Sequence, residues 1–175
     1  LYYNLNVTNP LGISINSFDS VSTTLSTPFT VDFYLKQGSY VGSELTPAPW
    51  TKVGTASGTS NPVSGAPSNA AFPQPLYIPA GTYGVAMRFV GITPRYVTLT
   101  ALTPYTNGDL TLTAGAASLS TAGAFTGTNL NTPRGLSGTL YYSTENVTSS
   151  AGHSFFGPGC AGSLGVSHQT YASRP

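Results

Sequence analysis

Charged side chains are scarce in this sequence, and their scarcity excludes several kinds of function. Lysine and arginine number 6 of 175 residues, aspartate and glutamate number 5, and charged residues make up 6% of the chain, about a quarter of the usual share. The net charge is +1, and the basic residues are scattered, so no positive patch is expected for nucleic acid or an anionic membrane. No apolar run approaches the roughly 18 residues of a membrane span. We expect no nucleic-acid partner and no membrane insertion.

Side chains for metal binding and catalysis are equally few. Cys160 is the only cysteine, and the histidines His153 and His168 lie near it without the count or spacing of a structural zinc site. Asp32 and Glu44 would have to be brought together by the fold to act as an acid and base pair, and no Gly-x-Ser-x-Gly elbow is present. The sequence therefore predicts no catalytic residues, no cofactor, no metal site and no enzymatic activity.

Hydroxyl, glycine and proline residues take the place of charge. Serine and threonine together number 46, beside 20 glycines, 14 prolines and 11 tyrosines. Threonine and tyrosine are favoured in β-strands, whose pleated surface is half-buried, whereas glycine, proline and serine are favoured in the turns between strands. The hydrophobic fraction of 39% is enough for a core, so the composition favours a folded β-protein over a disordered chain. This composition is typical of proteins outside the cell.

Apolar and polar residues alternate with a period of two along several segments, which indicates strands with one buried face. The clearest are residues 1–8, 29–36 and 82–89; weaker ones are 13–18, 50–56, 95–102, 110–114 and 138–144. Turn-separated short strands predict an all-β fold, an antiparallel, jelly-roll-like sandwich over residues 1–148. Residues 37–49 and 58–75 are expected to be long loops.

The last part of the sequence has a different composition. Residues 149–175 are rich in glycine and serine, show no sustained alternation, and are interpreted as an extended tail or connector. Their apolar groups are too few for a core of their own: Phe155, Phe156, Leu164, Val166 and Tyr171. We therefore expect the tail to dock on the same or a neighbouring subunit.

A series of short motifs adds a family resemblance. They are Lys36 to Gly42 (KQGSYVG), Trp50 to Gly54 (WTKVG), Ile78 to Val85 (IPAGTYGV), Tyr105 to Leu110 (YTNGDL), Pro133-Arg134 and Gly138 to Tyr142 (GTLYY). Together they resemble a β-sandwich module of secreted bacterial surface proteins over roughly residues 1–145, and Phe156 to Ser163 (FGPGCAGS) resembles a connector that follows it. The chain departs from that pattern at Gly135-Leu136, where the family often has an aromatic residue after Pro-Arg. The resemblance implies an extracellular or cell-surface location and no catalytic activity.

Two functions of different class follow. The first is an extracellular structural protein that self-assembles as a homopolymer, a filament, coat or adhesive stalk, by exchange of a terminal strand or tail. Its predicted subunit contacts are the apolar face of the first strand and a pair of aromatic residues in the tail: Leu1, Tyr3, Leu5, Val7, Phe155 and Phe156. The tail favours this function, because an assembling subunit needs such a segment and a lone sugar binder does not.

The second is a carbohydrate-binding module of a larger secreted protein. Its candidate glycan contacts are Trp50, Tyr40 and Tyr105, although such residues are more often core or loop anchors. Asn6 and Asn146 each begin an Asn-x-Thr pattern for N-glycosylation.

Overall fold

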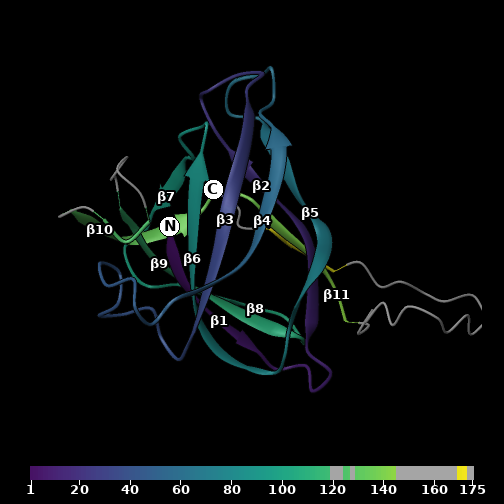
Figure 1. Ribbon diagram of the computed structural model, residues 1–175, viewed down its shortest axis with the longest axis vertical. Helices are drawn as coiled ribbons and strands as arrows, with labels where there is room; N and C mark the ends of the chain where they lie inside the picture. Colours follow the sequence, from purple (N-terminus) through teal and green to yellow (C-terminus); the bar gives the residue numbers. More distant parts are fainter. Residues whose placement is uncertain (119–123, 127–128, 145–168, 173–175) are drawn as a thin grey trace, which may run out of the picture.

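The computed structural model describes residues 1–118, 124–126, 129–144 and 169–172. All regular elements of these residues are β-strands (Figure 1). In chain order they are β1 (Tyr2–Val7), β2 (Ile13–Val21), β3 (Pro28–Gln37), β4 (Thr51–Thr59), β5 (Pro67–Ile78), β6 (Gly81–Val90), β7 (Tyr96–Thr98), β8 (Pro104–Thr106), β9 (Leu110–Ser118), β10 (Leu130–Leu136), β11 (Thr139–Ser143) and β12 (Gln169–Ala172).

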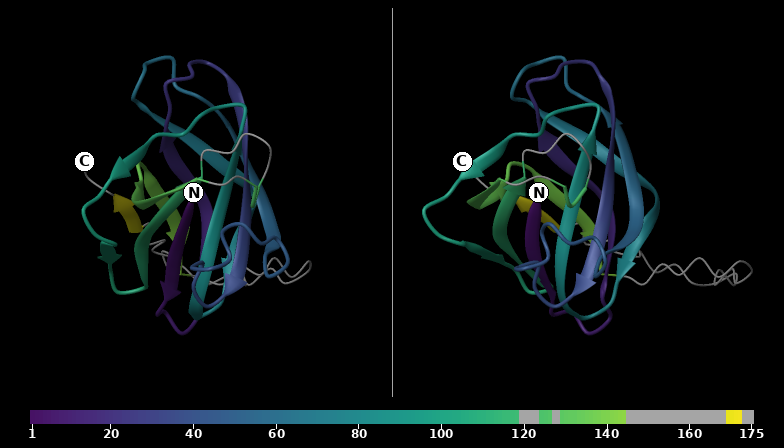
Figure 2. Two further views of the ribbon diagram at one scale, coloured as in Figure 1. Left: turned by 90° about the vertical axis from the view of Figure 1, so that its left-hand side faces the viewer. Right: turned by 60° about the vertical axis from the view of Figure 1, so that its left-hand side comes forward.

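The strands form one antiparallel sheet in the order β12-β11-β2-β5-β4-β3-β6-β1-β9-β10-β7, and β8 pairs with β9 beside this path. The sheet curls into a half-barrel around the main core (Figure 2). The predicted all-β, antiparallel fold is confirmed. The curl matters for function because it gives the molecule two distinct ends.

Period-two alternation accounts for the strands that form the wall of this core. Odd-numbered apolar residues of β1, β3 and β6 point inward, so the three neighbouring strands bury one continuous face. These residues are Tyr3, Leu5, Val7, Phe29, Val31, Phe33, Tyr83, Val85 and Met87. The inward faces predicted for these strands are therefore confirmed.

The prediction of a loop over residues 58–75 is wrong. β5 begins at Pro67 and lies between β2 and β4, with Ser68, Ala70 and Phe72 buried at alternate positions. Small residues and prolines hide this alternation in the sequence. The prolines are tolerated because the β2–β5 register shifts between Ile15 and Ser17, so Pro73 and Pro75 fall in a bulge. The predicted loop over 37–49 is confirmed, since no strand lies between β3 and β4.

A second, smaller cluster covers the outer face of β6, β1 and β9. The loop between β3 and β4 folds back over these strands, and the Trp50 Nε1 donates a 2.8 Å hydrogen bond to the Ser43 carbonyl. The Trp50 ring stacks on Phe125 at 5.1 Å, and Tyr2 contacts both rings. This part of the sheet is therefore packed on both faces, an arrangement on which the site described below depends.

One end of the half-barrel, here called the Asp109 end, is closed by hydrogen bonds between distant parts of the chain. The Asn107 Nδ2 donates to the Tyr142 hydroxyl at 2.8 Å, and that hydroxyl donates to Asp109 Oδ2 at 3.1 Å. The Asp109 carbonyl accepts the Thr8 amide at 2.8 Å. Burial, with a contribution from the Asp109 carboxylate, raises the pKa of Tyr142 to about 12. The network holds β11 against the end of β1.

Replacement of Phe33 by alanine tests the core. Phe33 is fully buried, and its ring lies 5.8 Å from that of Phe72, so Phe33→Ala should lower the free energy of unfolding by about 3–5 kcal/mol. The matched control is Leu102→Ala at an exposed position, which should change it by less than about 0.5 kcal/mol. Urea unfolding followed by circular dichroism measures both. A loss below about 1 kcal/mol at Phe33 would show that the side chain does not face the core.

Candidate functional site

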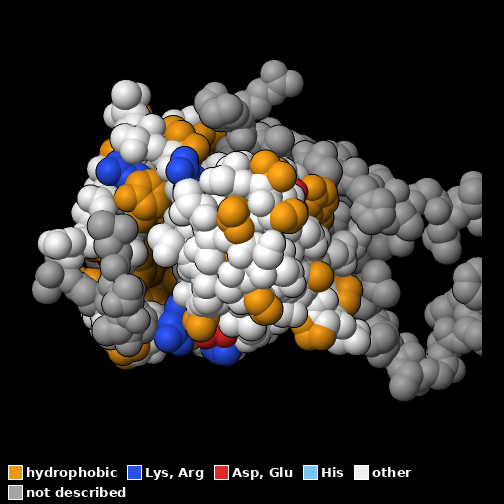
Figure 3. Space-filling view, turned by 90° about the horizontal axis from the view of Figure 1, so that it is seen from above, with side chains coloured by type: hydrophobic (Ala, Val, Ile, Leu, Met, Phe, Trp, Pro, Cys, Tyr) orange, Lys and Arg blue, Asp and Glu red, His pale blue; other side chains and the backbone are white. Residues whose placement is uncertain are grey.

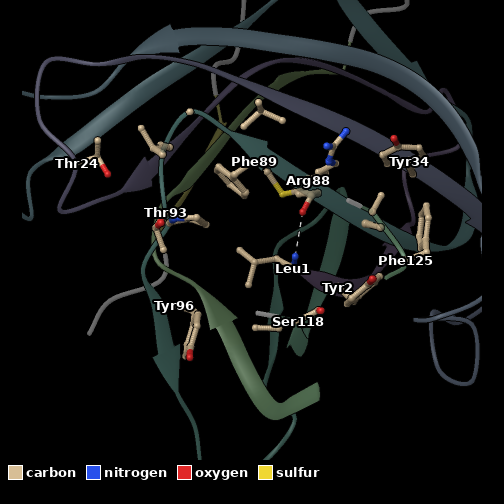
Figure 4. A pocket seen from close by; sticks show the side chains of 18 residues that line it. Leu1, Tyr2, Thr24, Tyr34, Arg88, Phe89, Thr93, Tyr96, Ser118 and Phe125 are labelled. Atoms are coloured by element: carbon tan, nitrogen blue, oxygen red, sulfur yellow. Dashed lines mark hydrogen bonds between the residues drawn. The ribbon is translucent and has the colours of Figure 1, made fainter. Parts of the chain in front are cut away.

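A cavity of about 450 Å³ opens at the end of the half-barrel opposite Asp109, here called the Leu1 end. Residues from both faces of the sheet line it, and Leu1 lies in its middle (Figure 4). Phe89, Thr93 and Tyr96 stand to one side of Leu1, and Tyr2, Tyr34 and Phe125 stand to the other. The cavity therefore passes through the plane of the sheet and has aromatic walls on both sides.

The cavity adjoins Leu1, where β1 pairs with β6. The last pairing of β1 with β6 is between Leu1 and Met87: the Met87 amide donates to the Leu1 carbonyl at 2.8 Å, and the Leu1 nitrogen donates to the Met87 carbonyl at 3.0 Å. β6 continues to Val90, and on the other side β9 continues past its pairing of Ala116 with Tyr2 to Ser118. The part of the cavity beside Leu1, between the ends of β6 and β9, is here called the slot.

The backbone of β6 presents hydrogen-bonding groups to this slot. Because residues of a strand direct their amide and carbonyl groups alternately to the two sides, Phe89 directs its groups to the same side as Met87. On that side, no described residue pairs with β6 beyond Met87. The N–H and C=O of Phe89 therefore face the cavity.

Two glycines shape the walls of the slot. Gly115 lies at the bulge between β1 and β9, where a Cβ would come within 2.0 Å of the Tyr2 carbonyl oxygen. Gly91 ends β6 with a φ of +98°, in the region that only glycine enters readily, and turns the chain away at the rim. β9 can approach β1 closely because Gly115 has no side chain, and the chain can turn sharply after β6 because Gly91 has none.

Charge near the slot is neutralised. Arg88 is the charged side chain among the lining residues, and its Nη1 lies 3.6 Å from Asp32 Oδ2. Asp32 also pairs with the Lys52 Nζ at 2.6 Å and accepts a 2.9 Å hydrogen bond from the Thr55 hydroxyl. Burial opposes the charge on Asp32, but the hydrogen bonds from Lys52 and Thr55 and the charges of Lys52 and Arg88 outweigh it, so its pKa lies below the ordinary value.

The structure places the residues of the first strand that the sequence predicts as subunit contacts. Tyr3, Leu5 and Val7 are buried in the core of their own chain, and Leu1 packs against that core. β1 is also paired along both of its edges, with β6 and with β9. Period-two alternation indicates a buried face but does not distinguish a central strand from an edge strand. In the single chain both edges of the first strand are paired and its inward face is buried, and exchange of this strand with a neighbouring subunit stays a prediction.

The structure also places the other candidate site residues. Trp50 and Tyr40 are only 8% and 3% exposed, so neither offers a ring face for a sugar, and Tyr105 is half-buried against the core. The Asn6 Oδ1 accepts a 3.0 Å hydrogen bond from the Thr82 hydroxyl. Phe155, Phe156 and Asn146 lie outside the described residues. The sequence does not predict the cavity, because its lining residues come from segments that are distant in sequence.

Comparison with protein-family models, with curated proteins and with solved structures found no match. The described part of the chain contains no group of three or more histidine, cysteine, aspartate or glutamate residues that could hold a metal ion. In that same part, no helix has the length and apolar character needed to cross a membrane.

The ion pairs of Asp32 predict a pH dependence of stability. A carboxyl group whose pKa is lowered by folding stabilises the protein at pH values above its ordinary pKa of 3.8. This stabilisation is lost as the pH falls through the folded-state pKa. The difference in free energy of unfolding between the wild type and Asp32→Asn should therefore be greatest near neutral pH and shrink in acid. Urea unfolding between about pH 7 and about pH 2 measures it. A difference that stays constant over this range would contradict the assignment.

Proposed function

We propose that this protein is an extracellular structural protein that self-assembles through its C-terminal region. The observation that carries the proposal is the position of β12, which pairs antiparallel with β11 at the outermost position of the sheet. Gln169 lies opposite Tyr142, and the Tyr142 hydroxyl donates a hydrogen bond to Asp109. β11 therefore ends, and β12 begins, at the same end of the half-barrel.

The sheet topology directs assembly to this region. β1 is enclosed between two strands, whereas β12 holds its place among the described residues by pairing along one edge only. Edge strands and the segments attached to them are the parts of a sheet that can engage another chain through main-chain hydrogen bonds. The C-terminal region is therefore the terminal segment best placed to reach a neighbour.

Low charge supports close packing of identical copies. Basic and acidic side chains are few on the face in Figure 3, most of whose coloured surface is uncharged polar groups and backbone. With a net charge of +1, identical subunits repel one another weakly. The expected extracellular location and the homopolymeric partner remain part of this proposal.

One observation favours the alternative, a carbohydrate-binding module of a larger secreted protein. The cavity at the Leu1 end combines aromatic rings with the hydroxyls of Thr24 and Thr93, and this mixture suits a sugar ring. The sites expected from the sequence do not add to it, because Trp50 and Tyr40 are buried. Saturable binding of a glycan by a protein that stays monomeric at high concentration would favour this alternative.

Truncation after Val147 tests the proposal. The change removes the C-terminal region and leaves the core of the half-barrel, since β12 is the last strand at one edge. We expect a folded protein by circular dichroism that no longer assembles, whereas the intact chain sediments as polymers. Assembly of the truncated protein at the level of the intact chain, or an intact chain that remains monomeric, would contradict the proposed function.

A further inference from the structure

We propose that Asn107 is a self-modifying site, at which the Gly108 nitrogen attacks the side-chain amide of Asn107 in the folded protein and asparagine is converted into aspartate. The inference goes beyond the proposed function and does not depend on assembly. Three features of the Asp109 end carry it: the turn that Asn107 forms, the residue that follows Asn107, and the hydrogen-bond network that its amide completes.

The side chain of Asn107 replaces a main-chain acceptor in the turn between β8 and β9. Its Oδ1 accepts the Asp109 amide at 2.9 Å and the Leu110 amide at 3.0 Å. A hydrogen bond from an asparagine side chain to the backbone two residues on closes a ring of atoms that includes the intervening nitrogen. In this turn the intervening nitrogen belongs to Gly108. The turn therefore bends the Asn107 Cγ back toward the atom with which it would react.

The two N–H groups on Oδ1 also activate the amide. Attack by a nitrogen on Cγ moves negative charge onto Oδ1, and donors that already point at the oxygen on which charge develops lower the barrier. Contacts with the end of β1 fix these donors, because the Thr8 and Asn9 amides donate to the Asp109 carbonyl at 2.8 and 3.0 Å. The turn therefore combines proximity of the reacting atoms with stabilisation of the charge that forms.

Two other asparagines form the same kind of turn but cannot react in this way. The Oδ1 atoms of Asn9 and Asn61 each accept a backbone amide two residues on, both at 2.9 Å. Both asparagines are followed by proline, whose nitrogen carries no hydrogen to lose. Asn107 is followed by Gly108, which is exposed and has open space where a side chain would stand. Of these three turns, the one at Asn107 is therefore the reactive one.

The reaction uses one water molecule and releases ammonia. The Gly108 nitrogen loses its proton to solvent and bonds to the Asn107 Cγ. The bond from Cγ to Nδ2 breaks, and Nδ2 keeps the electron pair, takes a proton from solvent and leaves as ammonia. Water then adds to one carbonyl of the succinimide ring and breaks the bond from that carbon to the Gly108 nitrogen. Addition at Cγ gives aspartate, and addition at the main-chain carbonyl gives isoaspartate.

Either product changes the network that holds β11. The Asn107 Nδ2 donates to the Tyr142 hydroxyl at 2.8 Å, and that hydroxyl donates its one proton to Asp109 Oδ2 at 3.1 Å. Loss of Nδ2 removes the first bond, and a carboxylate replaces the amide. The hydroxyl then has a single proton for two carboxylates, which repel each other. The modification therefore loosens β11, the strand with which β12 pairs.

Mass spectrometry of the purified protein, incubated at neutral pH, tests the reaction. Tandem spectra should show the mass change of an amide converted into an acid at Asn107, and not at Asn9 or Asn61. The reaction in the folded protein should be about tenfold or more faster than in a peptide with the sequence of residues 104–111, which lacks the fixed turn. An intact Asn107, or a reaction no faster than in the peptide, would overturn the proposal.

Gly108→Ala separates the chemistry from the fold. A Cβ at Gly108 would meet no atom within 4 Å, and its φ lies outside the left-handed region, so the variant should fold as the wild type does. The added methyl group crowds the attacking nitrogen and should slow the release of ammonia about tenfold. An unchanged rate would show that the Gly108 nitrogen is not the nucleophile, and the proposal would fail.

Asn107→Asp measures the effect of the modification on the network. It should lower the midpoint of urea unfolding more than the matched change Asn61→Asp does. The Asn61 Nδ2 also donates a hydrogen bond, to the Pro67 carbonyl at 3.1 Å, so both variants lose one donor. Of the two, Asn107 is the one joined through Tyr142 to a carboxylate. Equal midpoints would show that the change leaves the network intact and would overturn the proposed effect on β11.

Discussion

The double-sided pairing of β1 is the constraint on which the rest of the structure depends. Six residues of β1 are held between β6 and β9, with Tyr3, Leu5 and Val7 in the main core and Tyr2 in the outer cluster. This position makes the first strand indispensable to the core and removes it from the surface.

The sequence predicts the parts of the fold in which alternation is strong. Residues 1–8, 29–36 and 82–89 alternate bulky apolar and polar side chains, and they form β1, β3 and β6. β5 was missed because its buried positions are partly filled by Ser68 and Ala70, residues that carry little apolar signal. β8 and β10 contain prolines, which argue locally against a strand although a short or irregular edge accepts them.

The candidate site could not be predicted in the same way. A slot in a sheet is defined by where strands end relative to one another, and the register that aligns Leu1 with Met87 joins residues far apart in the chain. Trp50 illustrates the same limit for single residues. A lone tryptophan is more often a core or loop anchor than a sugar platform, and only the contacts of Trp50 with Ser43 and Phe125 show that it anchors a loop.

A density map of the assembled protein from electron microscopy tests the central claim most directly. The account predicts a polymer in which the C-terminal region of each subunit contacts a neighbouring subunit. A polymer in which the C-terminal region makes no contact with a neighbouring subunit would contradict it.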